Sequence, residues 1–375
     1  MAEITASGQH VALPDLPPPA SEVGVLGWLR KHLFSSWPNA FLTVVGLYLL
    51  YVIIPPVLEW AFINAHWQAG TNNAECSRTD IPAGACWTMI RARFGILMYG
   101  FYPSDERWRV DFTFLLQFFA IAGLLIEGIP YKKYWAIFLF GIYPFLALFL
   151  LLGGIGIPMV ETSQWGGLML NLVLATTGIV ASLPIGIMLA LGRRSKLPII
   201  RLLSVSFIEF VRGVPLITVL FMASVVFPLF MPEGVNFNKL LRVVVGIALF
   251  SAAYLAEVIR GGLQAIPKGQ YEGAMALGLN YWKMNALIIL PQALRISIPG
   301  IVNSFIGLFM DTTLVVIVGQ IELLGMAQSS ARDPNWLGTI NTALAFVSAV
   351  FFIFCFGMSR YSQYLERKLY TGHKR

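Results

Sequence analysis

The sequence predicts an all-α, polytopic membrane protein with about eight transmembrane helices. Of its 375 residues, 57 % are hydrophobic and only 12 % are charged, a composition that a soluble domain of this size could not carry on its surface. Apolar runs of membrane length recur along the chain, separated by short polar segments. The basic residues gather beside these runs, as at Arg193, Arg194, Lys196 and Arg201, which is typical of cytoplasmic loops. This arrangement explains the net charge of +7 without a nucleic-acid partner.

Residues 1–35 are expected to form a cytoplasmic tail. The segment is rich in proline and alanine, with neither a basic start nor an early apolar run, so we expect a disordered tail and not a signal peptide. The first span follows at about 40–60, and the basic residues Arg30 and Lys31 before it place the N-terminus inside the cell. The Pro55–Pro56 pair should kink or end this helix.

Residues 36–164 are expected to form an N-terminal extension with about three spans. The polar segment 61–110 follows the first span and therefore lies outside the cell in this topology. Cys76 and Cys86 are ten residues apart in it and are predicted to form a disulfide, because external compartments are oxidising; two free thiols are the alternative. Cys355 lies in a late apolar run and is expected to serve packing.

Two features of the segment 61–110 stand out. The apolar run 94–101 is too short to cross a bilayer, and we expect it at the interface or tucked against the bundle. Four external arginines run against the positive-inside tendency. They are Arg91, Arg93, Arg107 and Arg109.

About seven further spans are expected after the first. They lie at about 111–128, 134–153, 167–192, 212–231, 242–262, 296–322 and 339–359. An even total returns the C-terminus to the side of the N-terminus. The basic tail 366–375 requires the same side, so both termini are expected in the cytoplasm.

A polar, helix-prone stretch interrupts the apolar runs between two late spans. Glu272–Leu277 suits a short helix, Gly278 suits a helix end with positive φ, and Asn280 suits the cap of a second helix. We expect the second helix to span Tyr281–Leu290 and to end at Pro291, which lacks the N–H donor. A helix pair outside the bilayer has the form of a docking element for a soluble partner.

Six residues of this stretch lie at the spacing E-A-A-x3-G-x9-I-x-L-P. They are Glu272, Ala274, Gly278, Ile288, Leu290 and Pro291, with Gly273 in place of the first alanine. The stretch resembles the coupling loop of permease subunits of bacterial ABC importers. An ordinary interfacial amphipathic hairpin would explain the composition but not the spacing. The resemblance implies a type I ABC importer permease core at 165–365 and a cytoplasmic coupling loop at 263–295 through which these residues couple to the ATPase.

Three other segments resemble the polar amino acid subfamily of these importers. They are FIEFVRGVPLI at 207–217, AYLAEVIRGGLQAIPKGQYEGA at 253–274 and NSFIGLFMDTTLV at 303–315. Together with the extension, they make the chain similar to the larger permease of general L-amino acid importers. This resemblance implies a multi-pass inner-membrane subunit of an ATP-driven importer for L-amino acids of broad or polar range. It also implies a second homologous permease, two copies of an ATP-binding subunit and a periplasmic amino acid-binding protein as partners.

The chain is not expected to be an enzyme. No G-x-x-x-x-G-K-[ST] phosphate loop occurs in it, and no nucleophile lies beside a base in a recognisable motif. Its four histidines are scattered without metal-ligand spacing. We therefore expect no cofactor and no metal in this chain, with ATP and Mg²⁺ bound by the partner ATPase subunits.

Several ionisable residues fall at membrane boundaries, where charges are costly and normally paired. Glu209 and Arg212 are three residues apart, as are Glu257 and Arg260, so each pair shares a helix face and is expected to form a structural ion pair. Asp311 is different, because it lies in an apolar stretch with no cation nearby in the sequence. With Thr312 and Thr313, it either lines the substrate path or makes a buried hydrogen bond.

Two other classes of function stay open at this level. A secondary amino acid transporter or channel would work without ATP, and dependence of uptake on ATP instead of an ion gradient separates it from the importer. Inverted internal repeats would favour that rival, and none is seen in the sequence. A membrane scaffold would leave uptake intact when deleted.

Overall fold

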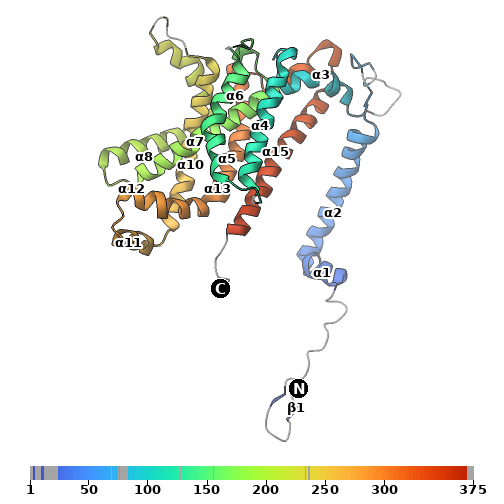
Figure 1. Cartoon of the computed structure of the whole chain (residues 1–375). Coiled ribbons are helices and arrows are strands. Elements are labelled where there is room, and N and C mark those ends of the chain that lie inside the picture. Colours follow the sequence, from blue (N-terminus) through green and yellow to red (C-terminus); the bar gives the residue numbers. More distant parts are fainter. Residues whose placement is uncertain are drawn as a thin grey trace. The chain divides into compact units, whose positions relative to one another are not determined.

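The computed structural model describes residues 3–4, 10–11, 24–68, 70–74, 76, 83–126, 128–154, 156–232, 234 and 237–369 (Figure 1). This part is helical except for β1 (Glu3–Ile4) and β2 (His10–Val11), which pair antiparallel. Seven helices are long and apolar enough to cross a membrane, or eight if one bent pair counts as a single span. The predicted all-α class and span count are thus confirmed. Most of the predicted N-terminal tail and residues 370–375 lie outside the described part.

The chain divides into two compact units. The first contains residues 1–66 and 78–85, and the second contains residues 67–77 and 86–375. The first span of the N-terminal extension belongs to the first unit, and its other two spans belong to the second.

In the first unit, α1 (Gly24–His32) precedes α2 (Trp37–Leu58). The side chain of Ser36 caps α2 by accepting the N–H of Asn39. Of the two expectations for Pro55 and Pro56, a kink or a helix end, the helix end is wrong, because α2 runs through both prolines into the π-helical turn η1 (Glu59–Ile63). The N–H of Glu59 reaches the carbonyls of both prolines, so the helix re-forms its hydrogen bonds directly after them.

The second unit holds all the remaining helices. They are α3 (Trp87–Tyr99), α4 (Arg107–Leu125), α5 (Lys132–Ile137), α6 (Tyr143–Leu152), α7 (Gly167–Arg193), α8 (Pro198–Arg212), α9 (Leu216–Phe221), α10 (Lys239–Ala265), α11 (Lys268–Ala276), α12 (Tyr281–Met284), α13 (Leu290–Asp311), α14 (Leu323–Ala331) and α15 (Ile340–Leu369). Two of them, α7 and α10, pack along each other, and α13 lies against both. A Cβ added at Gly186 would lie 2.9 Å from the Cβ of Leu255, so the glycine lets the two backbones approach closely.

The short apolar run 94–101 belongs to α3, which is tucked against the bundle. This helix packs on α7, α14 and α15, and its buried residues Met89 and Leu97 join a cluster with Leu323 and Trp336. With 13 residues, α3 is not among the helices long enough to cross a membrane, so it packs against the bundle instead of spanning.

The arginines that oppose the positive-inside tendency make local contacts in the structure. Arg93 forms an ion pair with Asp333. Arg109 is fully buried and pairs with Glu106 at 3.0 Å. The guanidinium of Arg107 lies over the Tyr99 ring, 5.2 Å from its centre. Each of these three arginines therefore has a partner within the second unit.

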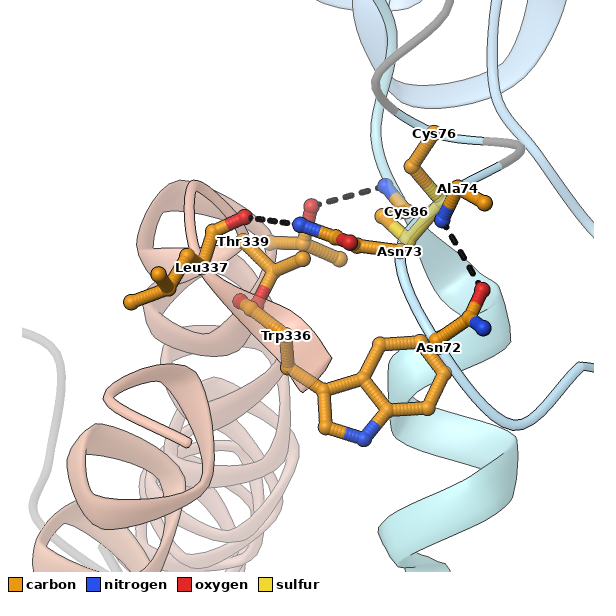
Figure 2. The surroundings of a disulfide bond; sticks show 9 residues. Asn72, Asn73, Ala74, Cys76, Cys86, Trp336, Leu337 and Thr339 are labelled. Atoms are coloured by element: carbon orange, nitrogen blue, oxygen red, sulfur yellow. Dashed lines mark hydrogen bonds between the residues drawn. A yellow bond between two sulfur atoms is a disulfide. The ribbon is translucent and has the colours of Figure 1, made fainter. Parts of the chain in front are cut away.

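A disulfide joins Cys76 to Cys86 at the start of α3 (Figure 2). The neighbouring Asn73 donates its backbone N–H to the Asn335 carbonyl at 2.7 Å and its side-chain amide to the Leu337 carbonyl at 2.6 Å. The N–H of Cys86 donates to the Thr342 hydroxyl at 2.8 Å. The loop and the disulfide are thereby fastened to the segment that leads into α15.

A buried polar network holds the turn between α13 and α14. Glu322 is fully buried and caps α14 by accepting the N–H groups of Leu324 and Gly325. The amide of Asn171 on α7 donates to Glu322 at 3.0 Å and to the Thr312 hydroxyl at 2.9 Å. Burial raises the pKa of the Glu322 carboxyl, and these three hydrogen bonds act to lower it.

We expect the Cys76–Cys86 bond to stabilise the α3 end of the second unit. Replacing both cysteines by serine opens a loop with a sequence separation of 10, which should cost about 2–3 kcal/mol in the chain-entropy description. Thermal unfolding in detergent would measure the loss, and Cys355→Ser, which removes a free thiol, is the control. Peptide mapping that found Cys76 and Cys86 as free thiols after isolation without reductant would contradict the expectation.

Candidate functional site

The stretch after α10 folds into two short helices around a glycine, as the sequence predicts. Gly278 follows α11 with φ of +70°, a conformation that glycine adopts without strain. The side chain of Asn280 accepts the N–H of Lys283 at 2.9 Å and so caps α12. Figure 1 shows α11 and α12 at the opposite end of the second unit from α3.

The prediction that the second helix ends at Pro291 is wrong. After α12, the π-helical turn η7 (Asn285–Ile289) leads directly into α13, and Pro291 lies in the first turn of α13. The N–H that proline lacks is not needed in a first turn, and the wider π-turn passes the chain into the new helix without a break. Helix α12 is therefore continuous with the apolar helix that follows, over Tyr281–Val318.

The residues that match the coupling-loop spacing have different surroundings. Ala274 is only 2 % exposed, and Ile288 and Leu290 pack beside it in one apolar cluster. Glu272 and Gly273 are exposed, and a Cβ at Gly273 would meet no atom within 4 Å. The residues that match the spacing are therefore of two kinds: some are buried in the hairpin and stabilise it, and others are exposed on its surface.

Sequence reasoning missed the apolar surface of this hairpin. Four large apolar side chains are exposed on it: Met275 at 59 %, Leu277 at 76 %, Trp282 at 72 % and Leu287 at 67 %. Met275 and Leu277 lie on or directly after α11, whereas Trp282 and Leu287 lie in the helical segment that continues into the span Tyr281–Val318. The sequence did contain a signal for this surface, because apolar residues stand among the polar residues of both short helices. Only the fold shows which of these apolar side chains are exposed.

The hairpin is fastened to the end of α7 through Tyr271. Arg194 donates to the Tyr271 hydroxyl at 3.0 Å and to the Leu263 carbonyl at 2.9 Å. Its guanidinium lies 5.6 Å from the centre of the Tyr271 ring. A displacement of α11 would therefore act on α7 and α10 together.

Beside this contact, three arginines converge on Glu257. The carboxylate pairs with Arg260 at 2.8 Å, as expected, with Arg193 at 3.0 Å and with Arg212 at 3.6 Å. Its side chain is 14 % exposed, so screening by water is limited. Glu257 thus ties the ends of α7, α8 and α10 together.

The expected pair between Glu209 and Arg212 is not the pairing that the structure contains. Glu209 forms an ion pair with Arg193 at 2.7 Å, and Arg212 forms one with Glu257. The physical reason is a bend of 105° between α8 and the segment Leu216–Phe230, which lays α8 against the ends of α7 and α10. Partners from other helices are then closer than the residue three positions away.

The three residues considered for a substrate path lie at the end of α13. Asp311 and Thr313 are partly exposed, and the Thr313 hydroxyl donates to the Met310 carbonyl at 2.9 Å. Thr312 is fully buried and belongs to the Asn171 network. Of the three, only Asp311 and Thr313 therefore have surface to offer to a solute in this conformation. Among the described residues, no group of histidine, cysteine, aspartate and glutamate side chains has the arrangement of a metal site.

We expect Glu257→Gln to destabilise this end of the bundle. The amide leaves Arg212 and Arg260 without a counter-charge and Arg193 with Glu209 as its one remaining partner, which should cost about 1–3 kcal/mol and lower the thermal unfolding midpoint. Glu209→Gln is the matched control, because that side chain is 54 % exposed and makes one ion pair. Equal unfolding midpoints for the two variants would show that the three ion pairs of Glu257 stabilise the protein no more than the single pair of Glu209.

Comparison with known proteins agrees with this architecture. Residues 182–370 match the family described as "Binding-protein-dependent transport system inner membrane component". The inner membrane amino-acid ABC transporter permease protein YhdY of Escherichia coli is 51 % identical over 369 residues, covering 96 % of this chain and 98 % of the relative.

Two further relatives differ in length. The glutamate/glutamine/aspartate/asparagine transport system permease protein BztC of Rhodobacter capsulatus is 43 % identical and covers 96 % of both chains. The glutamate/aspartate import permease protein GltK of Escherichia coli is 31 % identical over 208 residues, which are 54 % of this chain and 91 % of the relative. The chain therefore belongs to the binding-protein-dependent transport system inner membrane components, and among them to the amino-acid ABC transporter permeases.

Proposed function

We propose that this chain forms the translocation path of an ATP-driven importer for L-amino acids of broad or polar range. It is a permease subunit of an amino-acid ABC importer, a multi-pass inner-membrane protein without catalytic chemistry of its own. The observation that carries the proposal is the exposed hairpin α11–α12, which is held on the ends of two spans and belongs to a chain whose relatives are named as such permeases. The printed name of the Rhodobacter relative, with glutamate, glutamine, aspartate and asparagine, supports a polar range.

The hairpin is the element that we assign to coupling. An ATPase partner would cover Met275, Leu277 and Trp282, while Glu272 offers a charge at the edge of the same surface. ATP and Mg²⁺ would be bound by that partner, since no phosphate loop occurs in this sequence. When the partner closes on ATP, movement of α11 would pass through Tyr271 and Arg194 to α7 and α10, and the spans would rock between two states.

The remaining partners and the orientation belong to the same proposal. A second homologous permease, two ATP-binding subunits and a periplasmic amino acid-binding protein would complete the importer. Both termini and the hairpin would be cytoplasmic, and the disulfide end would face the periplasm, where a disulfide between Cys76 and Cys86 persists.

Gly278→Val should uncouple ATP hydrolysis from uptake while leaving the amount of membrane protein near normal. No neighbouring atom lies within 4 Å of a Cβ at Gly278, so the penalty comes from φ of +70°, about 1–3 kcal/mol for a β-branched residue. Gly273→Ala is the control, since its methyl group meets open space. The measurement is ATP-dependent uptake in vesicles that contain the complete importer.

The same vesicles test the alternative of a transporter independent of ATP. Uptake by the parent should require ATP and should persist when ionophores collapse ion gradients. Uptake that follows an ion gradient instead would contradict the proposed function. If Gly278→Val couples ATP hydrolysis to uptake normally, the importer function is not contradicted, but the angle between α11 and α12 is not needed for coupling.

Asp311→Asn should lower uptake more than it lowers the yield of assembled complex. The amide keeps the volume of the side chain and removes its charge, so a residue that lines the path loses its interaction with the solute. Uptake per assembled complex is the measurement, and Thr312→Val, which breaks the buried bond to Asn171, is expected to reduce assembly instead. Parallel loss of yield and uptake in Asp311→Asn would favour a structural role.

A further inference from the structure

A cavity lies at the end of α10 that is remote from the coupling hairpin. It has a volume of about 300 Å³ and is lined by the linker before α7, with Met159, Glu161 and Thr162, and by Asn238, Lys239 and Gln320. A volume of this size is at the lower end of the range for small-molecule sites.

A hydrogen bond joins the linker before α7 to the residue that precedes α10. The amide of Asn238 donates to the Thr162 hydroxyl at 2.8 Å, and the carbonyl oxygen of the same amide accepts the N–H of Leu240 and caps α10. The linker is thereby held beside the first turn of a helix of 27 residues. The N-terminus of such a helix favours negative charge.

The charges on the cavity wall are of opposite sign and come from different segments of the chain. Lys239 belongs to the first turn of α10, and its ammonium lies 3.1 Å from the position that a Cβ at Gly319 would occupy. Gly319 has φ of +73°, a conformation that favours glycine over residues with a side chain. The absence of a side chain at this position leaves room for the ammonium. Glu161 lines the same cavity from the linker and accepts only the Ser163 hydroxyl, at 3.1 Å, among the described residues.

Gln320 is the observation that points to a ligand. The residue is only 5 % exposed and lines the cavity. Its backbone N–H donates to the Val315 carbonyl, but its side-chain amide makes no hydrogen bond to any residue in the described part of the chain. A polar molecule in the cavity would give this amide hydrogen-bond partners.

We propose that this cavity is an entry site for the zwitterionic backbone of an L-amino acid, an inference that rests on the importer function proposed above. The α-carboxylate would face Lys239 and the start of α10, the α-ammonium would face Glu161, and the Gln320 amide would bond the ligand between them. Both charges of the ligand are common to all amino acids, so the site would accept a range of side chains.

The linker that carries Glu161 joins the extension to α7, so the extension would hold Glu161 at the core.

The test uses the complete importer in vesicles with its loaded binding protein. Lys239→Gln, Glu161→Gln and Gln320→Met should each lower maximal uptake by about three- to tenfold, the loss that one hydrogen bond or ion pair to a ligand predicts. The concentration of binding protein that half-stimulates ATP hydrolysis should not change. Arg332→Gln and Asp105→Asn remove exposed charges near the same end without lining the cavity, and they should match the parent.

Three outcomes would overturn the proposal. If the variants raise the half-stimulating concentration of binding protein but keep maximal uptake, the cavity is a docking surface for that protein. If Gln320→Met transports like the parent, the amide does not bond the solute. If the controls lose as much uptake as the cavity variants, the effect is one of general surface charge. Absence of uptake by the parent would instead contradict the importer function itself.

Discussion

The close packing of α10 against α7 is the constraint on which the rest of the second unit depends. In the window that defines α10 as a span, 61 % of the residues are buried, against 28 % for α7 and 33 % for the helix that contains α13. Hydrophobic burial drives helices into a membrane but does not drive them together there, because lipid is as apolar as their side chains. Small residues at the contact, such as Gly186 against Leu255, let dispersion contacts between close backbones supply the association.

This packing makes α10 the physical connection between the two ends of the unit. At one end, Lys239 and the Asn238 cap border a cavity that carries charges of both signs. At the other, Glu257 gathers arginines from three helices, and the Leu263 carbonyl receives Arg194 beside the hairpin. A helix that is buried on most of its sides moves as a unit with its neighbours. Movement at the hairpin would therefore reach the cavity through α10 itself.

The extension contributes to the same arrangement through covalent and polar contacts. The disulfide loop bonds to the segment before α15, α3 packs on α14, and Arg109 holds the linker at the Pro158 carbonyl. These contacts stiffen the end of the bundle where the cavity lies. A rigid frame around this cavity would lower the entropy lost when a ligand binds.

The sequence by itself determined the fold class, the approximate spans, the glycine joint of the hairpin with its Asn280 cap, and the family. Each depends on local information: the length of apolar runs, the backbone freedom of one glycine, and residues at fixed spacing. Only the tertiary structure decided which charges meet. Glu209 pairs with Arg193 because a sharp bend after α8 brings distant helix ends together, and Pro291 begins a helix because a π-turn precedes it. Likewise, Gln320 and Glu161 border one cavity although they are far apart in the chain, because packing between helices, and not periodicity along one helix, chooses such neighbours.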